Sequence, residues 1–478
     1  MLDYPLDLLA RVLEASRPAG GDRLVRRVCT DSRKVEPGDL FFALSGENFD
    51  GHEFVASAFD RGAVGAVVRK GRIPVKSAPG PLLAVSDPLL ALGTLGGWHR
   101  SRFPVRVVAV TGSVGKTTTK DLIHAVLSQQ WTTLKSPGNL NAEIGLPLTL
   151  LELRPHHETA VVELAMRGTG QIRYLARLAR PEVAVITNIG LSHLELLGSQ
   201  DAIAAAKGEV LEFLPHGGVA VLNAEDRYFQ YLSGLVPPGV RIMPYGLDRP
   251  EREATSGMYL GSASAPGERE GEGVVGGRFM LRGSGERTVR PAWIPLLGTH
   301  NVRNALAAAA VGQAMGVSAP RITRGLARAE ISAMRMAIHR LRDGTTVLDD
   351  AYNASTPEAM ISALEVLREM PALRKTAVLG NMLELGAATE EAHRKVGEAV
   401  ARVAPGLLIT VGEHARLIAQ EAIACGLPAE RVAICRTNDD AWNTLRELRR
   451  SGDVMLVKGS RGMQMESLIG QLTTDREV

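Results

Sequence analysis

The clearest chemistry in this sequence lies in a short segment between a strand-like and a helix-like stretch. The strand-like stretch, Val105–Val110, is apolar, and Asp121–Leu127 has the apolar spacing of a helix. The residues between them include Thr111, Gly112, Ser113, Val114, Gly115, Lys116, Thr117 and Thr118. In this order, backbone N–H groups and the helix N-terminus can surround phosphate groups. A lysine here reaches the outer phosphates of a nucleoside triphosphate, and the hydroxyl after it can ligate Mg²⁺.

The spacing of this loop departs from the general phosphate-loop pattern, G-x-x-x-x-G-K-[ST]. Val110 stands where the first glycine of that pattern would be, so the prediction depends on the strand before the loop and the helix after it. The alternative interpretation is an ordinary strand-to-helix turn with a surface lysine. The strand and the helix favour the phosphate loop, because they are the context that the motif requires.

Length and composition place limits on the fold and on the partners. A chain of 478 residues exceeds what one hydrophobic core usually organises, so we expect two or three domains. The formal net charge is +3, which gives no argument for nucleic acid as the main partner. Cys29, Cys425 and Cys435 are scattered, form neither a metal-binding pattern nor a disulfide framework, and suit a reducing compartment.

The sequence carries no sign of a membrane-spanning segment. Its first residues do not combine a basic region with a long apolar stretch, and no apolar run approaches the ~20 residues that cross a membrane. We therefore expect a soluble protein of the cytoplasm.

Apolar strands alternate with helical stretches along most of the chain, which predicts an α/β protein. We divide it into residues 1–103, residues 104–330 and residues 331–478, with Phe103 and Pro104 at the first join. The strands expected in the second block are Val105–Val110, Ala160–Leu164, Val183–Ile186 and Val219–Leu222. Those expected in the third are Thr346–Leu348, Thr376–Leu379, Leu407–Val411 and Val454–Val457. Both series are typical of mostly parallel sheets, and the third is typical of a doubly wound fold.

Two further stretches have a local interpretation. Leu40–Leu44 in the first block is strand-like. Residues 250–290 are rich in Gly, Ser, Glu and Arg, and short pieces such as Gly277–Leu281 predict β-hairpins or a flexible insertion rather than a separate domain.

Polar residues follow the expected strands of the second block, at the edge of the sheet where ligands of open α/β folds bind. Glu163 closes one strand, Thr187 and Asn188 follow another, and His193 lies on the loop beyond. A carboxylate and an imidazole there could hold Mg²⁺, directly or through water, although magnesium prefers oxygen ligands. Position alone supports equally well a helix cap for Glu163 and a hydrogen-bonded loop histidine.

Other polar residues of the second block are ambiguous. Lys207 lies in an alanine-rich helical stretch, and composition alone favours a solvated lysine. Asn139 and Asn141 are either helix caps or substrate contacts. Gly298–Ala305 opens a helix, and capping explains one of its asparagines but not two and a histidine.

The third block places polar residues after three of its expected strands. These residues are Asp350 with Asn353, then Asn381, and then Lys458 with Arg461. The last two are cations that flank glycine and serine, a combination suited to binding a carboxylate or phosphate. A surface turn is the alternative, and the convergence of three such strand ends argues against it.

Together these segments resemble the Mur ligase family, which builds the peptide of bacterial cell-wall precursors, and the resemblance covers nearly the whole chain in the same order. The motifs that carry it are Asp31-Ser32-Arg33, Asn48–His52, Thr111–Thr118, Thr187–Gly190, His193–Glu195, Gly198-Ser199, His300–Ala305, Asp350 with Tyr352–Ala354, Met382–Gly386 and Lys458–Gly462. Within the family, the chain is similar to the members that add D-alanyl-D-alanine to UDP-N-acetylmuramoyl-tripeptide in an ATP-dependent reaction.

The resemblance implies a role for each block. The first block binds the UDP-sugar end of the substrate, the second binds ATP, and the third, Rossmann-like block closes over both and helps to bind the dipeptide. Lys116 holds the β- and γ-phosphates, and Thr117, Glu163 and His193 serve magnesium ions. Lys207 matches a lysine that many family members carry as a carbamate, an anion able to bind the second Mg²⁺.

The resemblance also assigns contacts with the nucleotide and the substrates. Asn304, Arg335 and Asp350 match positions near the nucleotide. The positions that match substrate contacts are Ser32, Arg33, Asn48, Asp50, His52, Asn139, Asn141, Asn353, Asn381, Lys458 and Arg461. We expect a monomer.

The chain departs from the family pattern at a few positions. Ala142 replaces a second asparagine, Gln171 replaces a frequent glutamate, and Asn381 stands where an acidic residue is common. The segment Ser355-Thr356-Pro357 has one extra residue before its proline. These positions concern fine substrate contacts and not the class of reaction.

Two alternatives stay open. One is another amide ligase of the same architecture, which adds diaminopimelate, lysine or a folate glutamate. The Asp-Asn-Pro-Arg motif usual for diaminopimelate addition is absent, and Met382–Gly386 favours addition of the dipeptide. The other alternative is a nucleotide-dependent switch without ligase chemistry, which has no need for the second anion-binding site of the third block.

Overall fold

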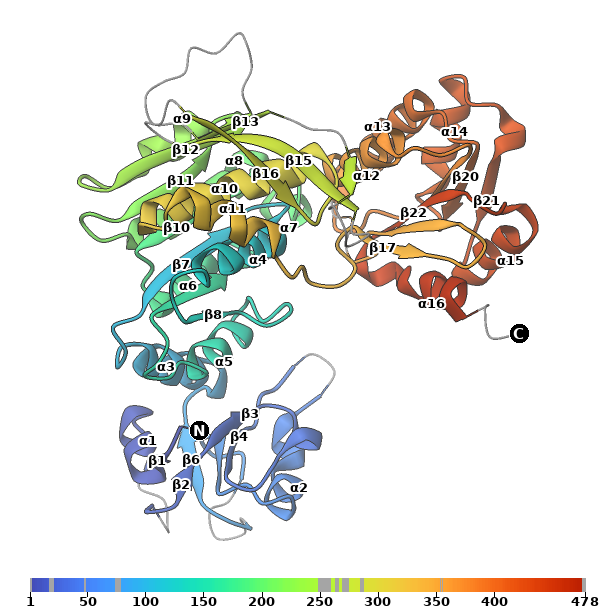
Figure 1. Ribbon diagram of the computed structural model, residues 1–478. Coiled ribbons are helices and arrows are strands. Elements are labelled where there is room, and N and C mark those ends of the chain that lie inside the picture. Colours follow the sequence, from blue (N-terminus) through green and yellow to red (C-terminus); the bar gives the residue numbers. More distant parts are fainter. Residues whose placement is uncertain are drawn as a thin grey trace. The chain divides into compact units, whose positions relative to one another are not determined.

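The structure is a computed structural model of mixed α/β architecture (Figure 1). It describes residues 2–16, 21–46, 49–73, 79–247, 259–262, 266–268, 275–283, 288–352, 354 and 356–474. The chain forms two compact units, the first of residues 1–109, 132–166 and 171–181 and the second of residues 110–131, 167–170 and 182–478. The expected α/β class is therefore confirmed, whereas the boundaries of the expected domains stay predictions.

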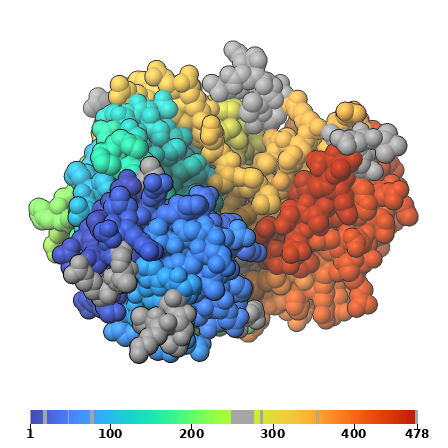
Figure 2. All heavy atoms as spheres, turned by 90° about the horizontal axis from the view of Figure 1, so that it is seen from below, coloured from blue at the N-terminus to red at the C-terminus, as the bar shows by residue number. Residues whose placement is uncertain are grey.

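A small parallel sheet organises the beginning of the first unit. Its strands, in spatial order, are β3 (Arg27–Cys29), β4 (Asp39–Phe42), β5 (Gly65–Arg69) and β6 (Leu82–Val85). The other elements are β1 (Tyr4–Pro5), which pairs with β2 (Leu24–Val25), and the helices α1 (Leu6–Val12), α2 (Val55–Asp60) and α3 (Pro88–Arg100). The atoms of this block, coloured blue, gather in one body in Figure 2.

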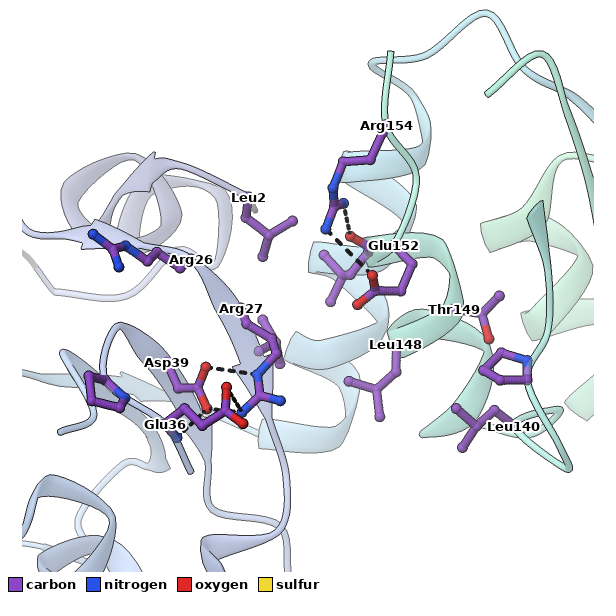
Figure 3. A pocket seen from close by; sticks show the side chains of 14 residues that line it. Leu2, Arg26, Arg27, Glu36, Asp39, Leu140, Leu148, Thr149, Glu152 and Arg154 are labelled. Carbon is purple, nitrogen blue, oxygen red and sulfur yellow. Dashed lines mark hydrogen bonds and ion pairs between the residues drawn. The ribbon is translucent and has the colours of Figure 1, made fainter. Parts of the chain in front are cut away.

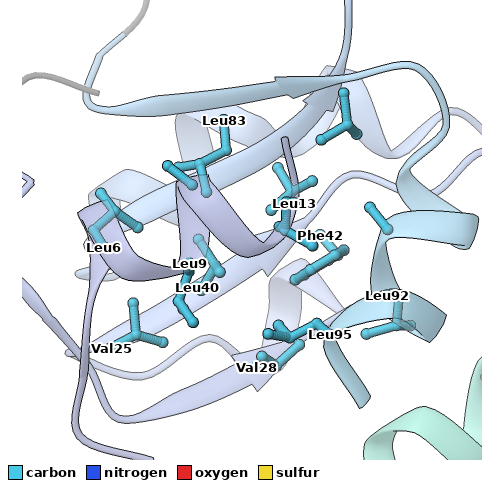
Figure 4. Packing of buried hydrophobic residues seen from close by; sticks show 14 of the residues in the cluster. Leu6, Leu9, Leu13, Val25, Val28, Leu40, Phe42, Leu83, Leu92 and Leu95 are labelled. Carbon is cyan, nitrogen blue, oxygen red and sulfur yellow. The ribbon is translucent and has the colours of Figure 1, made fainter. Parts of the chain in front are cut away.

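Both faces of this sheet are buried, because successive strand residues point to opposite sides. On β4, which overlaps the expected strand Leu40–Leu44 at Leu40–Phe42, Leu40 and Phe42 join the core that contains α1 and α3 (Figure 4). Phe41 joins the second core, which contains Val55 and Ala58 of α2. A strand buried on both faces explains why this stretch is a continuous apolar run.

The first unit also contains two strands and two helices from later in the chain. They are β8 (Thr133–Lys135), the parallel strand β9 (Thr159–Glu163), α5 (Gly145–Leu151) and α6 (Gln171–Ala179). The helix α3 packs against α5 and α6. A Cβ at Gly96 of α3 would lie 2.8 Å from the Cα of Pro147 in α5, so glycine permits this close approach.

A buried histidine at the end of α3 makes the stability of the first unit sensitive to acid. His99 is 2% exposed, with Nε2 3.1 Å from the carbonyl oxygen of Leu153 and Nδ1 3.0 Å from the hydroxyl of Tyr4. Burial lowers the pKa of His99 to about 4. Because the unfolded chain binds this proton near pH 6.5, acidification from pH 7 to pH 5 is expected to cost about 2 kcal/mol of stability through this group.

The substitution His99→Gln tests this expectation, because glutamine can donate to the same carbonyl but does not titrate. Urea unfolding followed by tryptophan fluorescence between pH 7 and pH 5 should show a shallower loss of stability in the variant than in the unaltered chain. Equal slopes in the two proteins would contradict the role of His99.

The second unit contains a larger mixed sheet. β7 (Arg106–Thr111) leads from the first unit into the second. The parallel strands β10 (Val183–Ile186), β11 (Val219–Asn223), β12 (Arg241–Leu247) and β13 (Tyr259–Ser262) are neighbours in this order. β15 (Val275–Arg282) pairs antiparallel with β13, β14 (Pro266–Glu268) and β16 (Val289–Ile294), which confirms the hairpin expected at Gly277–Leu281.

The helices of this part include α4, which follows the predicted phosphate loop. They are α4 (Lys116–Leu127), α7 (Leu194–Leu197), α8 (Gln200–Gly208), α9 (Phe229–Gly234), α10 (Thr299–Met315) and α11 (Ala319–Ala327). α10 and α11 pack against α4. A Cβ at Gly325 of α11 would lie 2.7 Å from the carbonyl oxygen of Ala125, so α4 and α11 are in very close contact.

The C-terminal part of the second unit is a doubly wound sheet, as expected. Its strands, in spatial order, are β17 (Ala337–Arg340), β18 (Thr346–Asp349), β22 (Val454–Lys458), β19 (Lys375–Gly380), β20 (Leu407–Val411) and β21 (Val432–Cys435). Only the β17–β18 pair is antiparallel in this sheet as the structure describes it. The helices are α12 (Pro357–Glu369), α13 (Thr389–Val403), α14 (Arg416–Ala424), α15 (Asn438–Leu448) and α16 (Glu466–Thr474).

The strand order brings the carboxyl ends of β18, β22 and β19 side by side, so the polar residues after these strands share one edge.

All three cysteines are free thiols. Within the described ranges, the helices are too short or too polar to cross a bilayer.

Candidate active site

The loop between β7 and α4 has the backbone of a tight phosphate-binding turn. Gly112 has φ 142° and Gly115 has φ 84°, conformations that side chains rarely adopt. A Cβ at Gly112 would lie 1.9 Å from Oγ1 of Thr187, and a Cβ at Gly115 would lie 2.6 Å from Oδ1 of Asn304. Val110, by contrast, is a fully buried strand residue. The loop therefore needs glycine at positions 112 and 115 but not at position 110.

A second loop, after β10, is hydrogen-bonded to the phosphate loop. Asn188 accepts from the backbone N–H of Val114 through Oδ1 (3.0 Å) and donates to the carbonyl of Val114 through Nδ2 (2.9 Å). The hydroxyl of Thr187 donates to the same carbonyl, and Ser113 N–H donates to the carbonyl of Asn188. The first turn of α4 begins at Lys116 without a side-chain cap. Because first-turn N–H groups lack intrahelical acceptors, they are donors available to an anion.

Two lysines meet at this loop. Nζ of Lys116 donates to the carbonyl oxygens of Gly112 (2.9 Å) and Ser113 (3.3 Å), and Nζ of Lys207 donates to the same Gly112 carbonyl at 3.1 Å. Lys207 is 2% exposed on α8, so composition alone was wrong in favouring a solvated lysine. Burial, and then the charge of Lys116, lower the pKa of Lys207 well below its usual value. Burial therefore favours the neutral amine of Lys207 over its ammonium form.

His193 lies beside this pair at the start of α7. Burial, and then Lys207 and Lys116, lower its pKa to about 4, so the imidazole is neutral at pH 7. Its Nδ1 lies 3.3 Å from Oε2 of Glu384, a residue of the Met382–Gly386 segment. Both His193 and Glu384 have positive φ, 66° and 64°. The Lys116 ammonium beside the Gly112 carbonyl suits an anionic ligand.

A cavity of about 600 Å³ opens beside the phosphate loop and contains predicted residues from all parts of the second unit. Those residues are Val114, Gly115, Thr118, Asn304, Arg335, Asp350 and Lys458. Its further lining includes Asn188, Glu225, Asp226, Arg227, Tyr245, His300, Asn301, Arg303, Glu358 and Lys395. The structure therefore brings the predicted nucleotide contacts together.

The predicted residues of this cavity hold one another in place. Nη2 of Arg335 donates to Oγ1 of Thr117 at 3.1 Å, and its guanidinium lies 3.9 Å above the ring of Tyr352. Lys458, buried at the end of β22, forms an ion pair with Asp350 after β18. Asn304 accepts from the hydroxyl of Thr119 on α4. This connects α4, α10 and the edge of the C-terminal sheet.

Several lining residues were missed by the analysis of the sequence. Glu225 accepts from Nε of Arg303 at 2.9 Å, and Asp226 accepts from the N–H of Ile189 at 2.7 Å. Both follow β11, so the strand-end rule could have found them. Tyr245, whose hydroxyl donates to the carbonyl of Thr187, lies in β12, which a proline in its sequence concealed.

The predicted substrate residues of the first unit form two small clusters. Asp31 accepts from Nε of Arg33 at 2.9 Å, and this contact lowers the pKa of Asp31 to about 2. Ser32 begins the 3₁₀ turn that Asp31 caps. Nδ1 of His52 lies 2.6 Å from Oδ1 of Asp50, and Nε2 accepts from a backbone N–H, so the proton is on Nδ1.

The other predicted residues are placed as follows. Glu163 ends β9 in the first unit and accepts from Nδ2 of Asn141 at 2.8 Å, whereas Asn139 is exposed. Asn381 uses Oδ1 to accept from the N–H of Ala415, and Arg461 pairs with Glu466. Asn48 and Asn353 lie outside the described residues.

The structure shows the surroundings of three residues that depart from the family pattern. Gln171 donates to Glu143 at 2.9 Å, and Thr356 caps α12 by accepting from the N–H of Ala359. Ala142 is exposed. These contacts give Gln171 and Thr356 structural roles.

A second cavity, of about 610 Å³, lies within the first unit (Figure 3). Its apolar lining includes Leu2, Leu140 and Leu148, and two of its arginines pair with carboxylates of the same lining. Nη2 of Arg27 lies 2.6 Å from Asp39, and Nη2 of Arg154 lies 3.5 Å from Glu152. The sequence did not predict this cavity.

Comparison with known proteins agrees with the geometry. The Mur ligase family, catalytic domain, matches residues 24–96, the Mur ligase middle domain matches residues 110–312, and the Mur ligase, glutamate ligase domain, matches residues 334–461. The phosphate loop lies within the segment that the middle domain matches.

Full-length relatives show the same similarity. The UDP-N-acetylmuramoyl-tripeptide–D-alanyl-D-alanine ligase of Bacillus subtilis is 36% identical over 458 residues, which cover 96% of this chain and 95% of that protein. The MurF crystal structure from Acinetobacter baumannii superposes with a TM-score of 0.85 at 31% identity and 98% coverage of both chains. The MurF ligase of Thermotoga maritima, solved in complex with ADP, gives 0.78 at 26% identity, covering 94% of this chain and 97% of that one. The chain belongs to the Mur ligase family.

Proposed function

We propose that this protein is the ATP-dependent ligase that joins D-alanyl-D-alanine to UDP-N-acetylmuramoyl-tripeptide in the synthesis of peptidoglycan precursors. The observation that carries the proposal is the phosphate loop around Lys116, which opens into the cavity lined by Asn304, Arg335, Asp350 and Lys458. The names of the full-length relatives support the same reaction.

The reaction requires activation of an acid. A carboxylate is a poor electrophile, so transfer of the γ-phosphoryl group of ATP first converts it into an acyl phosphate, with ADP as the leaving group. The amine of D-alanyl-D-alanine then attacks the acyl carbon, loses a proton, and expels phosphate through a tetrahedral intermediate. The chain contributes positioning and charge stabilisation rather than covalent chemistry.

Lys116 is the cation that meets the phosphates. In this structure its Nζ donates to two carbonyl oxygens of its own loop. An oxygen of the γ-phosphate can take the place of these acceptors when ATP binds. The carboxylate and the γ-phosphate are both anions, and Lys116 reduces the repulsion between them. Closure of the C-terminal part over the site excludes water from the acyl phosphate.

Mg²⁺ is the cofactor that this reaction class implies, and the residues fit it on the condition that Lys207 is a carbamate. The described residues contain no group of three or more His, Cys, Asp or Glu side chains placed for a metal ion. Thr117 supplies a hydroxyl, His193 is neutral, and Lys207 supplies oxygen ligands only as a carbamate. Bound Mg²⁺ would neutralise phosphate charge, and we propose Thr117, Glu163, His193 and carbamylated Lys207 as the residues that hold it.

The substrate contacts follow the three family domains, which we place at residues 1–103, 104–330 and 331–478. We propose that the turn at Ser32-Arg33 and the Asp50–His52 pair bind the UDP-sugar end, with Asn48. We propose that Asn139 and Asn141 contact the same substrate. On the third domain, Asn353, Asn381, Lys458 and Arg461 serve the carboxylate-bearing dipeptide. We place the protein in the cytoplasm as a monomer.

An assay of ADP release with each substrate omitted in turn tests the proposal. Release should require ATP, the UDP-linked tripeptide and D-alanyl-D-alanine together, and an amide product should appear in the same amount. A panel of amines, with diaminopimelate, lysine and glutamate, separates this ligase from its relatives. Nucleotide binding without release under any combination would identify a switch and overturn the proposal.

A further inference from the structure

The segment that joins the two parts of the second unit is fastened to α4 by a buried carboxylate. α11 ends at Ala327 and β17 begins at Ala337, so residues 328–336 make the connection. Oδ2 of Asp121 accepts from both the backbone N–H (3.0 Å) and the hydroxyl (2.7 Å) of Ser332. The side chain of Asp121 is 0% exposed, and its Oδ1 lies 3.5 Å from Nζ of the buried Lys120.

Two residues further on, the same segment belongs to the C-terminal sheet. The carbonyl of Met334 accepts from the N–H of Tyr352, and the N–H of Met336 donates to Oδ1 of Asp350. Met334 and Met336 have φ of 58° and 56°, which is uncommon for residues other than glycine and is maintained here by these contacts. The attachment therefore changes from α4 to the C-terminal sheet within Ser332–Met334.

Arg335 spans the two attachments. It donates to Thr117 of α4 and stacks on Tyr352. Thr117 and Asp121 are four residues apart, so they lie on the same face of α4. The Thr117 contact involves a hydroxyl that the proposed metal ion also uses, whereas the Asp121 contact is buried and charge-assisted. The Asp121 contact therefore uses no group that is proposed to hold the nucleotide or the metal ion.

We propose that Asp121 is a positioning residue that, by holding Ser332 against α4, fixes the start of the C-terminal part relative to the phosphate loop. This inference rests on the proposed function, because the C-terminal part carries Arg335, Asp350 and Lys458, which line the same cavity as Gly115 and Thr118. Since α4 also carries Lys116, the attachment is fixed relative to the phosphates. Asp121 touches no reacting atom and acts through the placement of the C-terminal part.

The substitutions Ser332→Ala and Asp121→Asn test the proposal, because each weakens the attachment without shortening the connection. We expect the dissociation constant for ATP to stay within about twofold, whereas kcat for amide formation falls about ten- to a hundredfold, as misplacement of reacting groups does. ADP should also appear in excess over amide, because imperfect closure admits water to the acyl phosphate. Ser332→Thr keeps both donors and should restore most of the activity.

Ser318→Ala is the matched control, since Ser318 is exposed, makes no side-chain cap to α11 and lies in the same unit. It should leave ATP binding, kcat and the ratio of ADP to amide unchanged. If Asp121→Asn does not fold, Ser332→Ala decides alone.

Two results would overturn the proposal. One is a kcat within about twofold of the unaltered protein in the folded variants. The other is an equal loss of ATP affinity and kcat, which would indicate general damage to α4. Failure of the proposed function is a different result, since the unaltered chain itself would then release no ADP with both substrates present.

Discussion

Lys116→Ala is expected to abolish the ADP release that depends on both the acid and the amine. The ammonium group of Lys116 is the cation of the phosphate loop that reaches the outer phosphates. Its Nζ lies 2.9 Å from the carbonyl oxygen of Gly112, within the loop. Removal of one such preorganised charge costs about 10²–10³ in kcat in comparable sites. The α4 N-terminus remains, so weak nucleotide binding should persist.

A steady-state assay of ADP release, with the amide product measured in parallel, checks this expectation. Lys375→Ala is a suitable control, because Lys375 begins β19 at the opposite end of the strand from the site. The control should retain the activity of the unaltered chain. Turnover of Lys116→Ala close to that level would exclude the proposed role of Lys116.

Lys207→Ala is expected to cause a loss of similar size, for a different reason. Burial, and then the charge of Lys116, lower the pKa of Lys207 and so favour the neutral amine, which can attack CO₂, forming an N–C bond and releasing a proton. The resulting carbamate has the oxygen ligands that Mg²⁺ prefers, and it places an anion beside Lys116. Its loss should lower kcat about 10²–10³-fold, as loss of a metal ligand or transition-state charge does.

Short carboxylates give this prediction a specific signature. Acetate or formate should partly restore the activity of Lys207→Ala, because a free carboxylate can occupy the space of the missing carbamate, but should not restore Lys116→Ala. In the unaltered protein, carbon-13 bicarbonate should give a carbamate signal in the NMR spectrum that Lys207→Ala lacks. Full activity of the variant without added carboxylate would contradict the prediction.

The regular elements were predictable where their apolar runs are uninterrupted. Val183–Ile186 and Leu407–Val411 are strands with the expected bounds, and both are entirely buried. β12 (Arg241–Leu247) was missed, since its inner proline and polar residues break the apolar run. β21 (Val432–Cys435) was missed because an outer strand with only one buried residue has a weak pattern.

The site was predictable where polar residues follow strands, and not where tertiary packing decides. Asp350 and Lys458 meet because β18 and β22 are neighbours, which the strand-end rule anticipates. Lys207 is buried because it shares a helix face with Ile203 and Ala204, and an alanine-rich sequence does not reveal which face is covered. The Asp121–Ser332 contact joins positions 211 residues apart, for which local patterns carry no signal.

The central claim, that the γ-phosphoryl group of ATP activates the carboxylate of the tripeptide, has a direct chemical test. The tripeptide is labelled with oxygen-18 in its reacting carboxylate and incubated with the protein, ATP, magnesium and D-alanyl-D-alanine. If an acyl phosphate forms, one labelled oxygen leaves with the phosphate, and the released phosphate carries one oxygen-18 for each amide formed. Amide formation with unlabelled phosphate would contradict the account.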